Sequence, residues 1–349
     1  MHYITRADIS YIATGAAMLG SGGGGNPAPL VPIARYHCDA GHVTVIQPED
    51  LANDDLVVPV ACVGAPLIMS ERILAGHDCD YLFNALRADY PDRRIIIAPA
   101  EIGGSNALTP LILARRTGCY VLDADLLGRA FPHMYMSKPH VLNMDLSALY
   151  ITDPIGNSGK FHTVTRYHIE AIARNITISM GSAALVACEL MSGQQAQQYV
   201  VYSSLSRAYA LGEAVHNAHT VDNPAHTVLQ ATTGSILMEG MVTDVMYTIE
   251  NGFLTGTVTI ENNDTCITLA YRNENLIAYN EHTVFATTPD IIIPLDRHTG
   301  EPITTEAIMY GVRVTLVRMQ PPHVWTTQAG LRLVGPQAFG YPYDYKDVL

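Results

Sequence analysis

The sequence is short of positive charge. Its 349 residues include 20 Lys and Arg against 33 Asp and Glu, which gives a formal net charge of −13. A negative field of this size repels phosphate backbones and anionic membrane surfaces, so we expect neither nucleic acid nor a membrane as a partner. Charged residues make up only 15% of the chain against 48% apolar residues. This balance indicates surface hidden between domains or subunits and favours a homo-oligomer.

Cysteine pairs and long apolar runs are also missing. The six cysteines form no Cys-x-x-Cys pair, so neither a disulfide framework nor a zinc knuckle is indicated. The longest apolar stretch, residues 56–69, is too short for a transmembrane helix and is interrupted by Pro59, Gly64 and Pro66. The first residues lack a basic stretch followed by an apolar core, so we expect no secretory signal and a cytoplasmic location.

Nucleotide and catalytic-triad motifs are absent as well. A glycine-rich run at residues 21–26 follows a predicted helix that begins with a capping pattern at residues 5–8 and ends at Gly20. It lacks the Gly-Lys-Ser/Thr of a P-loop and the preceding strand of a dinucleotide site, so no nucleotide is expected. Ser182 and Cys188 are available as nucleophiles, but neither lies in a Gly-x-Ser-x-Gly elbow. The sequence therefore does not support triad chemistry.

The first half of the chain alternates between strand and helix patterns. Short β-rich runs at residues 42–47, 56–63, 94–98 and 119–122 alternate with helical patterns at residues 71–89 and from a cap at Ser105 to before Gly118. This order predicts an α/β N-terminal domain, residues 1–165, with a mostly parallel sheet covered by helices.

The second half is richer in β patterns. Two Thr- and Val-rich runs at residues 236–249 and 253–260 are joined by Glu250-Asn251-Gly252, a strong hairpin signal. Helical patterns precede them, and three further strand-like runs follow. We therefore predict a C-terminal α+β domain over residues 166–349, with a β-rich module at about residues 235–320.

Acidic residues follow two predicted strands of the N-terminal sheet. Glu101 comes after one strand, and Asp123 and Asp125 come after the next. Ligands of parallel sheets bind beyond the carboxyl ends of the strands, so these groups could converge on one crevice. Two carboxylates there suit a divalent cation or acid–base chemistry. The alternative is a helix cap with a salt bridge from Asp-Ala-Asp to Arg129.

The glycine run and several histidines are further candidates. Backbone amides of Gly22, Gly23, Gly24 and Gly25 could cradle an anion or a developing oxyanion, whereas the alternative is a tight crossing where no Cβ fits. His133 and His140 lie in an irregular stretch and could be metal ligands, general bases or surface histidines. His216 and His219, spaced i, i+3, could hold zinc or simply complement a helix end.

Blocks of sequence along nearly the whole chain resemble the S-methyl thiohydantoin desulfurase-like family. Each block matches in the expected order, and the resemblance covers both halves of the chain. The N-terminal blocks are the glycine run at residues 20–27, Glu101-Ile102-Gly103-Gly104-Ser105-Asn106 and residues 123–132. The C-terminal blocks are Asn273-Glu274-Asn275-Leu276, Thr288-Pro289-Asp290-Ile291, residues 299–303, Tyr310-Gly311 and residues 335–341. The chain departs from the family pattern at Leu126, Leu127, His133 and residues 27–29.

The resemblance implies an α/β domain followed by a domain with a β-rich swivelling module, in proteins associated with hydantoinases and oxoprolinases. It implies a hydrolase that acts on a thiohydantoin- or hydantoin-like heterocycle and replaces ring sulfur by oxygen. We expect Glu101, Asp123, Asp125 and His133 to be catalytic. A divalent metal, zinc first, would be held by Asp123, Asp125 and His140. The substrate would be bound by Gly22, Gly23, Gly24, Gly25, Asn26, Asn106 and Arg129. The alternative is a non-catalytic sensor or accessory subunit of a hydantoinase-type enzyme.

Overall fold

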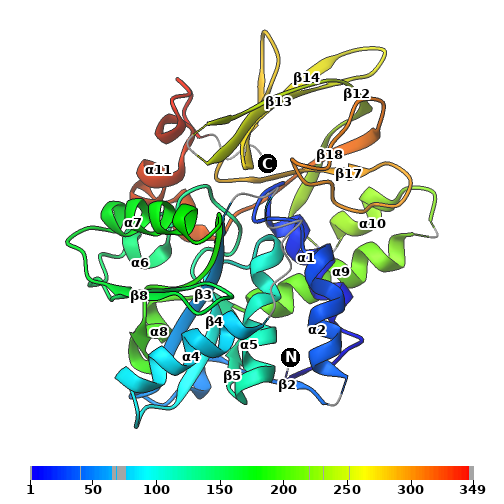
Figure 1. Cartoon of the computed structure of the whole chain (residues 1–349). Helices are drawn as coiled ribbons and strands as arrows, with labels where there is room; N and C mark the ends of the chain where they lie inside the picture. Colours follow the sequence, from blue (N-terminus) through cyan, green and yellow to red (C-terminus); the bar gives the residue numbers. More distant parts are fainter. Residues whose placement is uncertain are drawn as a thin grey trace.

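The N-terminal half is built on a nine-stranded sheet covered by helices (Figure 1). The computed structural model describes residues 2–39, 41–64, 68, 76–219, 221–230, 232–250 and 252–345. Along the sheet the order is β1-β2-β5-β4-β3-β9-β7-β8, and β10 pairs with β3. The strands are β1 (Tyr3–Ile4), β2 (Val43–Ile46), β3 (Leu56–Gly64), β4 (Ile95–Pro99), β5 (Tyr120–Leu122), β7 (Leu149–Thr152), β8 (Ser158–Phe161), β9 (Ala183–Ala187) and β10 (Met191–Ser192).

The centre of this sheet is parallel and its flanks are antiparallel. Strands β2, β5, β4 and β3 run parallel, with Leu56 opposite Ile95 and Val60 opposite Pro99. Their apolar runs are buried because helices cover both faces of the sheet. On the flanks, β1, β9, β7 and β8 pair antiparallel. The α/β layout is confirmed, and the expectation of a mostly parallel sheet is corrected to a mixed one.

The helices begin and end largely where the sequence signals placed them. Helix α1 ends at Leu19 with Gly20 as its C-cap. Ser105 is not a cap, because it lies inside the 3-10 turn η3, and α5 begins only at Thr109. The predicted helix at 71–89 is described from His77, and residues 71–75 lie outside the described residues. The helices are α1 (Ile9–Leu19), α2 (Val31–Cys38), α4 (His77–Asp89), α5 (Thr109–Thr117), α6 (Lys138–Val141), α7 (Arg166–Ser179), α8 (Gly193–Tyr199), α9 (Ser204–Ala218), α10 (Pro224–Gln230) and α11 (Gln328–Val334), with 3-10 turns η1 (Ala28–Leu30), η2 (Pro48–Asp50), η3 (Gly104–Ala107), η4 (His323–Thr326) and η5 (Pro336–Phe339).

The C-terminal part carries a curled antiparallel sheet, the yellow and orange strands of Figure 1. Its order is β16-β15-β14-β13-β12-β18-β17, and the predicted β-rich module corresponds to it. The strands are β12 (Gly234–Glu250), β13 (Phe253–Glu261), β14 (Cys266–Arg272), β15 (Glu274–Tyr279), β16 (Val284–Thr287), β17 (Ile291–Asp296) and β18 (Arg313–Met319). A small separate sheet pairs β11 (Val201–Tyr202) with β6 (Ala124–Asp125). The two-domain fold class is confirmed. The N-terminal sheet nevertheless takes β9 and β10 from beyond residue 165.

The glycine loop after α1 joins the two parts of the molecule (Figure 1). On the N-terminal side, the Ser105 amide donates to the carbonyl oxygens of Gly24 and Gly25, both at 3.0 Å. On the C-terminal side, the Asn275 amide donates to Ser21 O at 2.7 Å and the Thr305 amide donates to Gly22 O at 2.8 Å. The loop is therefore held from both sides by backbone hydrogen bonds.

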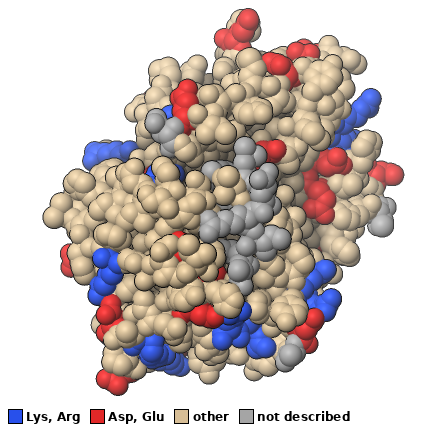
Figure 2. Space-filling model, in the orientation of Figure 1, with Lys and Arg blue, Asp and Glu red and all other residues tan. Residues whose placement is uncertain are grey.

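None of the described helices combines the length and apolar character needed to cross a membrane. On the face shown in Figure 2, Lys and Arg side chains lie singly or in small groups among Asp and Glu.

The close approach at Gly24 leads to a stability prediction. A Cβ at Gly24 would lie 2.4 Å from the Gly103 carbonyl oxygen, in a backbone with φ of +72°. Gly118 has nearly the same φ, +75°, with no atom within 4 Å of an added Cβ. We expect Gly24→Ala to lower the free energy of unfolding by about 2 kcal/mol more than Gly118→Ala, because only Gly24→Ala adds a clash to the backbone strain. Urea denaturation of both variants measures this, and equal losses would contradict the close approach.

Candidate functional site

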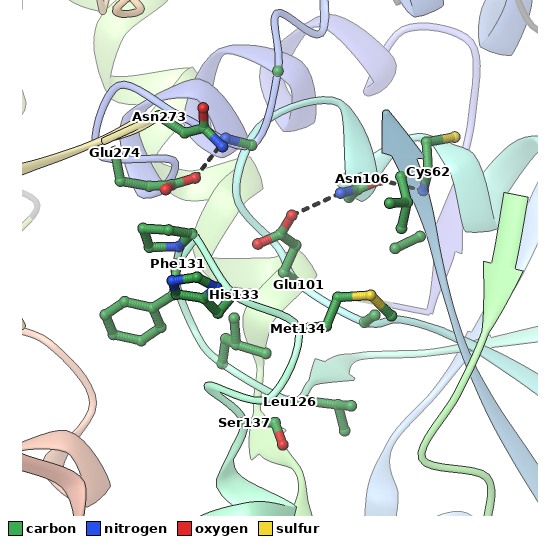
Figure 3. Close-up of a pocket in the computed structure, with 18 of the residues that line it drawn as sticks. Cys62, Glu101, Asn106, Leu126, Phe131, His133, Met134, Ser137, Asn273 and Glu274 are labelled. Atoms are coloured by element: carbon green, nitrogen blue, oxygen red, sulfur yellow. Dashed lines mark hydrogen bonds between the residues drawn. The ribbon is translucent and has the colours of Figure 1, made fainter. Parts of the chain in front are cut away.

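A cavity lies between the two parts of the chain, beside the glycine loop. Its volume of about 130 Å³ leaves room for about four water molecules or one small substituted ring. Strand ends and loops of the N-terminal half form most of its wall, and the β14–β15 turn closes it from the other side (Figure 3). The polar and charged side chains that line it are Glu101, Asn106, His133, Ser137, Arg174, Glu189, Asn273, Glu274, Thr305 and Glu306.

Glu101 follows β4 and points into the cavity (Figure 3). Asn106 donates from Nδ2 to Glu101 Oε1 at 2.7 Å, and its Oδ1 accepts from the Cys62 amide at 2.8 Å. The Cys62 N–H can only donate, so the Asn106 atom that it contacts must be the amide oxygen; this contact fixes the orientation of the Asn106 amide. Burial raises the pKa of Glu101 to about 7, against the opposing effect of the Asn106 hydrogen bond. Glu101 can therefore exchange a proton near neutral pH.

Glu274 enters the cavity from the opposite domain. It begins β15, next to Asn273, whose positive φ of 56° makes the tight turn from β14. The Gly24 amide donates to Glu274 Oε1 at 3.2 Å, whereas Oε2 is buried and has no hydrogen-bond partner. Burial raises the pKa of Glu274 to about 8; the negative charge of Glu101 raises it further, and Arg129 opposes both. Figure 3 shows the carboxyl groups of Glu274 and Glu101 pointing toward one another.

Arg129 lies close enough to this carboxyl pair to interact with both charges, and it is fully buried. Its Nη1 donates to the carbonyl oxygens of Pro289 and Asp290, both at 2.6 Å, and its Nε donates to Ala130 O at 2.8 Å. Burial lowers the pKa of Arg129 to about 10, and the nearby carboxylates Glu274, Asp290 and Glu101 oppose that shift. Arg129 is absent from the cavity lining, so it acts on the cavity through charge and not through contact.

His133 lies on the cavity wall in a fixed orientation. Its Nδ1 is 2.8 Å from Glu170 Oε1, and Arg174 donates to the same oxygen at 2.7 Å. The imidazole stacks on Tyr135 with ring centroids 4.8 Å apart and meets the edge of Phe253 at 4.9 Å. The contacts with Glu170 hold α7 against the wall of the cavity. They use Nδ1 of His133, so Nε2 is the ring nitrogen left for a ligand.

Part of the cavity wall is apolar. In Figure 3, Leu126 lies on the far side of Glu101 from Asn273 and Glu274, with Ser137 beside it, and Met134 lies next to Glu101. Cys62 and Cys188 also line the wall, and burial raises the pKa of each thiol to about 12, so both are neutral near pH 7. The cavity therefore has polar groups that exchange protons and a part of its wall that suits an apolar substituent. The further apolar lining residues are Ala61, Val63, Ala100, Leu127, Phe131 and Pro132.

Asp123 and Asp125 lie outside the cavity lining. Asp125 Oδ2 accepts from the Ile102 amide at 2.8 Å, and its Oδ1 accepts from the Ser204 hydroxyl at 2.6 Å. Asp123 accepts from the amide of Ser206 at 3.0 Å and from its hydroxyl. Strand β5 ends at Leu122, and both carboxylates face the first turn of α9. The structure thus favours the helix-cap alternative for these two residues. The salt bridge to Arg129 that belonged to the same alternative is not among the ion pairs of the described residues.

The residues predicted to hold zinc do not come together. Asp123 and Asp125 are occupied at α9, and His140 Nδ1 is bound to the Tyr135 carbonyl at 2.7 Å. His140 is likewise absent from the cavity lining. Among the described residues, no group of three or more His, Cys, Asp or Glu side chains is arranged to hold a metal ion. The predicted ligand set therefore does not fit a metal.

The glycine run is divided between structure and cavity. Gly23, Gly24 and Gly25 line the cavity, whereas Gly22 packs under Asn275 and Thr305. Asn26 is exposed, and its Oδ1 accepts from the Ala28 amide at 2.9 Å, so it makes a turn outside the cavity. Both interpretations of the run from sequence have a counterpart: the crossing leaves no room for Cβ atoms, and the same segment forms a cavity wall.

The sequence reasoning brought Glu101, Asn106, His133 and the glycines to one site but missed Glu274. Glu274 stands inside a block that resembled the family, yet it received no role, because nothing local marks a residue at a strand start as buried and unpartnered. Thr305 and Glu306 were also missed; the Thr305 hydroxyl donates to the carbonyl oxygens of Gly22 and Asn273, contacts between residues far apart in the sequence. The available signal was the acidic residue in the Asn273-Glu274-Asn275 turn, flanked by two residues that favour positive φ.

Comparison with known proteins places this chain in a family. Profiles of the S-Me-THD-like N-terminal domain and C-terminal domain match residues 7–163 and 164–348. The chain belongs to the S-Me-THD-like (S-methyl thiohydantoin desulfurase-like) family. A crystal structure of a protein from Chromobacterium violaceum has the same fold, with a TM-score of 0.84, 20% identity and 99% of each chain covered. A search of curated proteins found no significant match.

The hydrogen bonds of Asp125 predict a structural role that can be measured. In Asp125→Ala, the N–H donors of Ile102 and Gly128, which now bond to the carboxylate at 2.8 Å, would lose their acceptor. We expect a loss of about 2–4 kcal/mol in the free energy of unfolding, the cost of unpaired buried groups. Asp264→Ala, at an exposed turn, is the control and should change stability by less than about 0.5 kcal/mol. Similar unfolding midpoints for the two variants would show that Asp125 is not needed for the fold.

Proposed function

We propose that the protein hydrolyses a small nitrogen heterocycle of the thiohydantoin type in this cavity. Glu101 and Glu274 would transfer the protons to and from the substrate and water. The observation that carries this proposal is the facing pair of carboxyl groups from two domains, with pKa values raised to about 7 and about 8. Carboxyl pairs with raised and separated pKa values are typical of acid–base catalysis near neutral pH. Membership of the S-Me-THD-like family supports the choice of heterocycle.

The polar and apolar parts of the cavity wall suit the two parts of such a substrate. A methylthio-substituted imidazolone has a ring edge with N and C=O groups and an apolar S-methyl group. The ring edge matches the hydrogen-bonding groups of Glu101, Glu274 and Asn106, and the S-methyl group matches the wall formed by Leu126 and Met134. Leu126, Leu127 and His133, where this chain departs from the family pattern, all line the cavity and would set the fit of the substituent.

The reaction needs two proton donors and two proton acceptors in sequence. Ionised Glu101 removes a proton from water as the oxygen bonds to the ring carbon that carries sulfur, while protonated Glu274 gives a proton to the adjacent ring nitrogen. The tetrahedral carbon then loses its C–S bond. The new hydroxyl returns its proton to Glu274, and the departing thiolate takes the proton held by Glu101. The products are the ring carbonyl compound and methanethiol, and both carboxyl groups regain their starting states.

Substitution of either carboxyl group tests this assignment. We expect Glu101→Gln and Glu274→Gln each to lower the rate of methanethiol release from S-methyl thiohydantoin by about 100-fold or more, since each removes a proton-transfer group. Glu281→Gln removes one carboxylate at an exposed position in the C-terminal domain, which also carries Glu274. This control variant should keep wild-type turnover. A thiol-reactive dye follows the product. Turnover that survives in both cavity variants would refute the proposed roles.

The pH profile gives an independent test. The base Glu101 must be ionised, so kcat/KM should rise as the pH passes about 7. The acid Glu274 must be protonated, so kcat/KM should fall as the pH passes about 8. We expect a narrow bell with its maximum between these values, whose two apparent pKa values belong to the coupled pair. A profile that is flat from pH 6 to pH 9 would exclude this pair as the catalytic acid and base.

A further inference from the structure

Glu274 has an acceptor that nothing in the described structure satisfies. The side chain is 3% exposed, and its Oε2 has no hydrogen-bond partner although Oε1 is held by the Gly24 amide. The residue lines the cavity, and its carboxyl end points toward Glu101 (Figure 3). A buried polar atom without a partner is costly, so a ligand that supplies one is favoured. A ligand N–H group can donate to the ionised carboxylate, and a ligand carbonyl oxygen can accept from the protonated acid.

The described arginine on the cavity wall is already bound to other partners. Arg174 donates to Glu170 and to the Pro132 carbonyl at 2.9 Å, and Arg166, which lies outside the lining, pairs with Glu189 at 2.6 Å. Arg129 also lies outside the lining; its Nε and Nη1 donate to three backbone carbonyls, and its buried Nη2 has no hydrogen-bond partner. Four carboxyl groups line the same space: Glu101, Glu189, Glu274 and Glu306. No described cation on the cavity wall is therefore without an acidic or carbonyl partner.

We propose that this cavity selects heterocycles that are neutral or positively charged and excludes those that carry a carboxylate. The inference deepens the proposed function, because it names the charge class of the ligand of the same cavity. A carboxylate on the ring would stand among like charges in a space that water screens poorly, and no cation on the described cavity wall is free to pair with it. An amide of the same shape avoids the repulsion and keeps the hydrogen bonds.

Two matched probes test the proposal by binding alone. Hydantoin-5-acetamide and hydantoin-5-acetic acid have nearly the same shape and differ by one charge. By isothermal titration calorimetry at pH 8, we expect the wild-type protein to bind the amide at least tenfold more tightly than the acid. Equal affinity for the two probes, or no measurable binding of either, would overturn the proposal.

Variants assign the preference to the carboxyl pair. In Glu101→Gln/Glu274→Gln we expect the two probes to bind within about threefold of one another, because the charges that repel the acid are gone. Glu281→Gln should keep the wild-type ratio. An undiminished preference in the double variant would overturn the assignment. Circular dichroism checks that the double variant folds.

Should the double variant not fold, the wild-type protein decides by its pH dependence. At pH 6 both carboxyl groups hold protons, so the preference for the amide should shrink at least threefold relative to pH 8, and a constant ratio would overturn the proposal. Besides the pair, the charged or titratable groups that line the cavity are Cys62, His133, Arg174, Cys188, Glu189 and Glu306, and Asp125 and Arg129 act on the pair by their charge from outside the lining.

The outcome is separable from that of the proposed hydrolysis. A charge preference without release of methanethiol would keep this inference and remove the catalytic proposal. Turnover of the methylthio compound without a charge preference would do the reverse.

Discussion

The close crossing of the glycine loop is the constraint on which the site depends. Side chains at these positions would collide with the other strands of the crossing: a Cβ at Gly23 would lie 2.2 Å from Glu274 Oε1, and a Cβ at Gly104 would lie 2.3 Å from Gly24 O. Because the loop is bare backbone, the β14–β15 turn can approach the end of β4. Glu274 thereby reaches Glu101, although its contact with Gly24 spans 250 residues of sequence. The same loop therefore joins the two domains and positions the two carboxyl groups of the pair.

The electrostatics of the pair follow from this burial. Two carboxyl groups in a poorly hydrated space resist ionisation, and each charge makes the next harder to form. Arg129 offsets part of this cost from behind the wall, and it stays in place because three carbonyl groups hold its guanidinium. The arrangement keeps protons on the pair near neutral pH without an ion pair that would fix them. A surface pair could not do this, since water would restore ordinary pKa values.

Local patterns in the sequence predicted the elements well and the long-range site only in part. The helix that ends before Gly20, the apolar strands β3 and β4 and the antiparallel pairing of β12 with β13 all follow from signals within a few residues. Asp123 and Asp125 were expected at the site because their spacing would place both side chains on one side of a continued strand. The strand instead stops at Leu122, and both carboxylates bond to serines about 80 residues downstream. No local rule identifies such partners, and the same limitation hid Glu274.

The backbone hydrogen bonds also decide how charge on a reacting ring would be stabilised. The sequence suggested that amides of the glycine loop form an oxyanion hole. The Gly23 amide donates to Gly20 O at 2.9 Å, and the Gly24 amide donates to Glu274. Two of the loop amides that line the cavity are therefore already used, one of them to orient the acid. A protonated carboxyl group is itself a hydrogen-bond donor, as a raised pKa allows. In the proposed reaction, Glu274 thus takes over the role first assigned to the loop, and the loop determines where Glu274 stands.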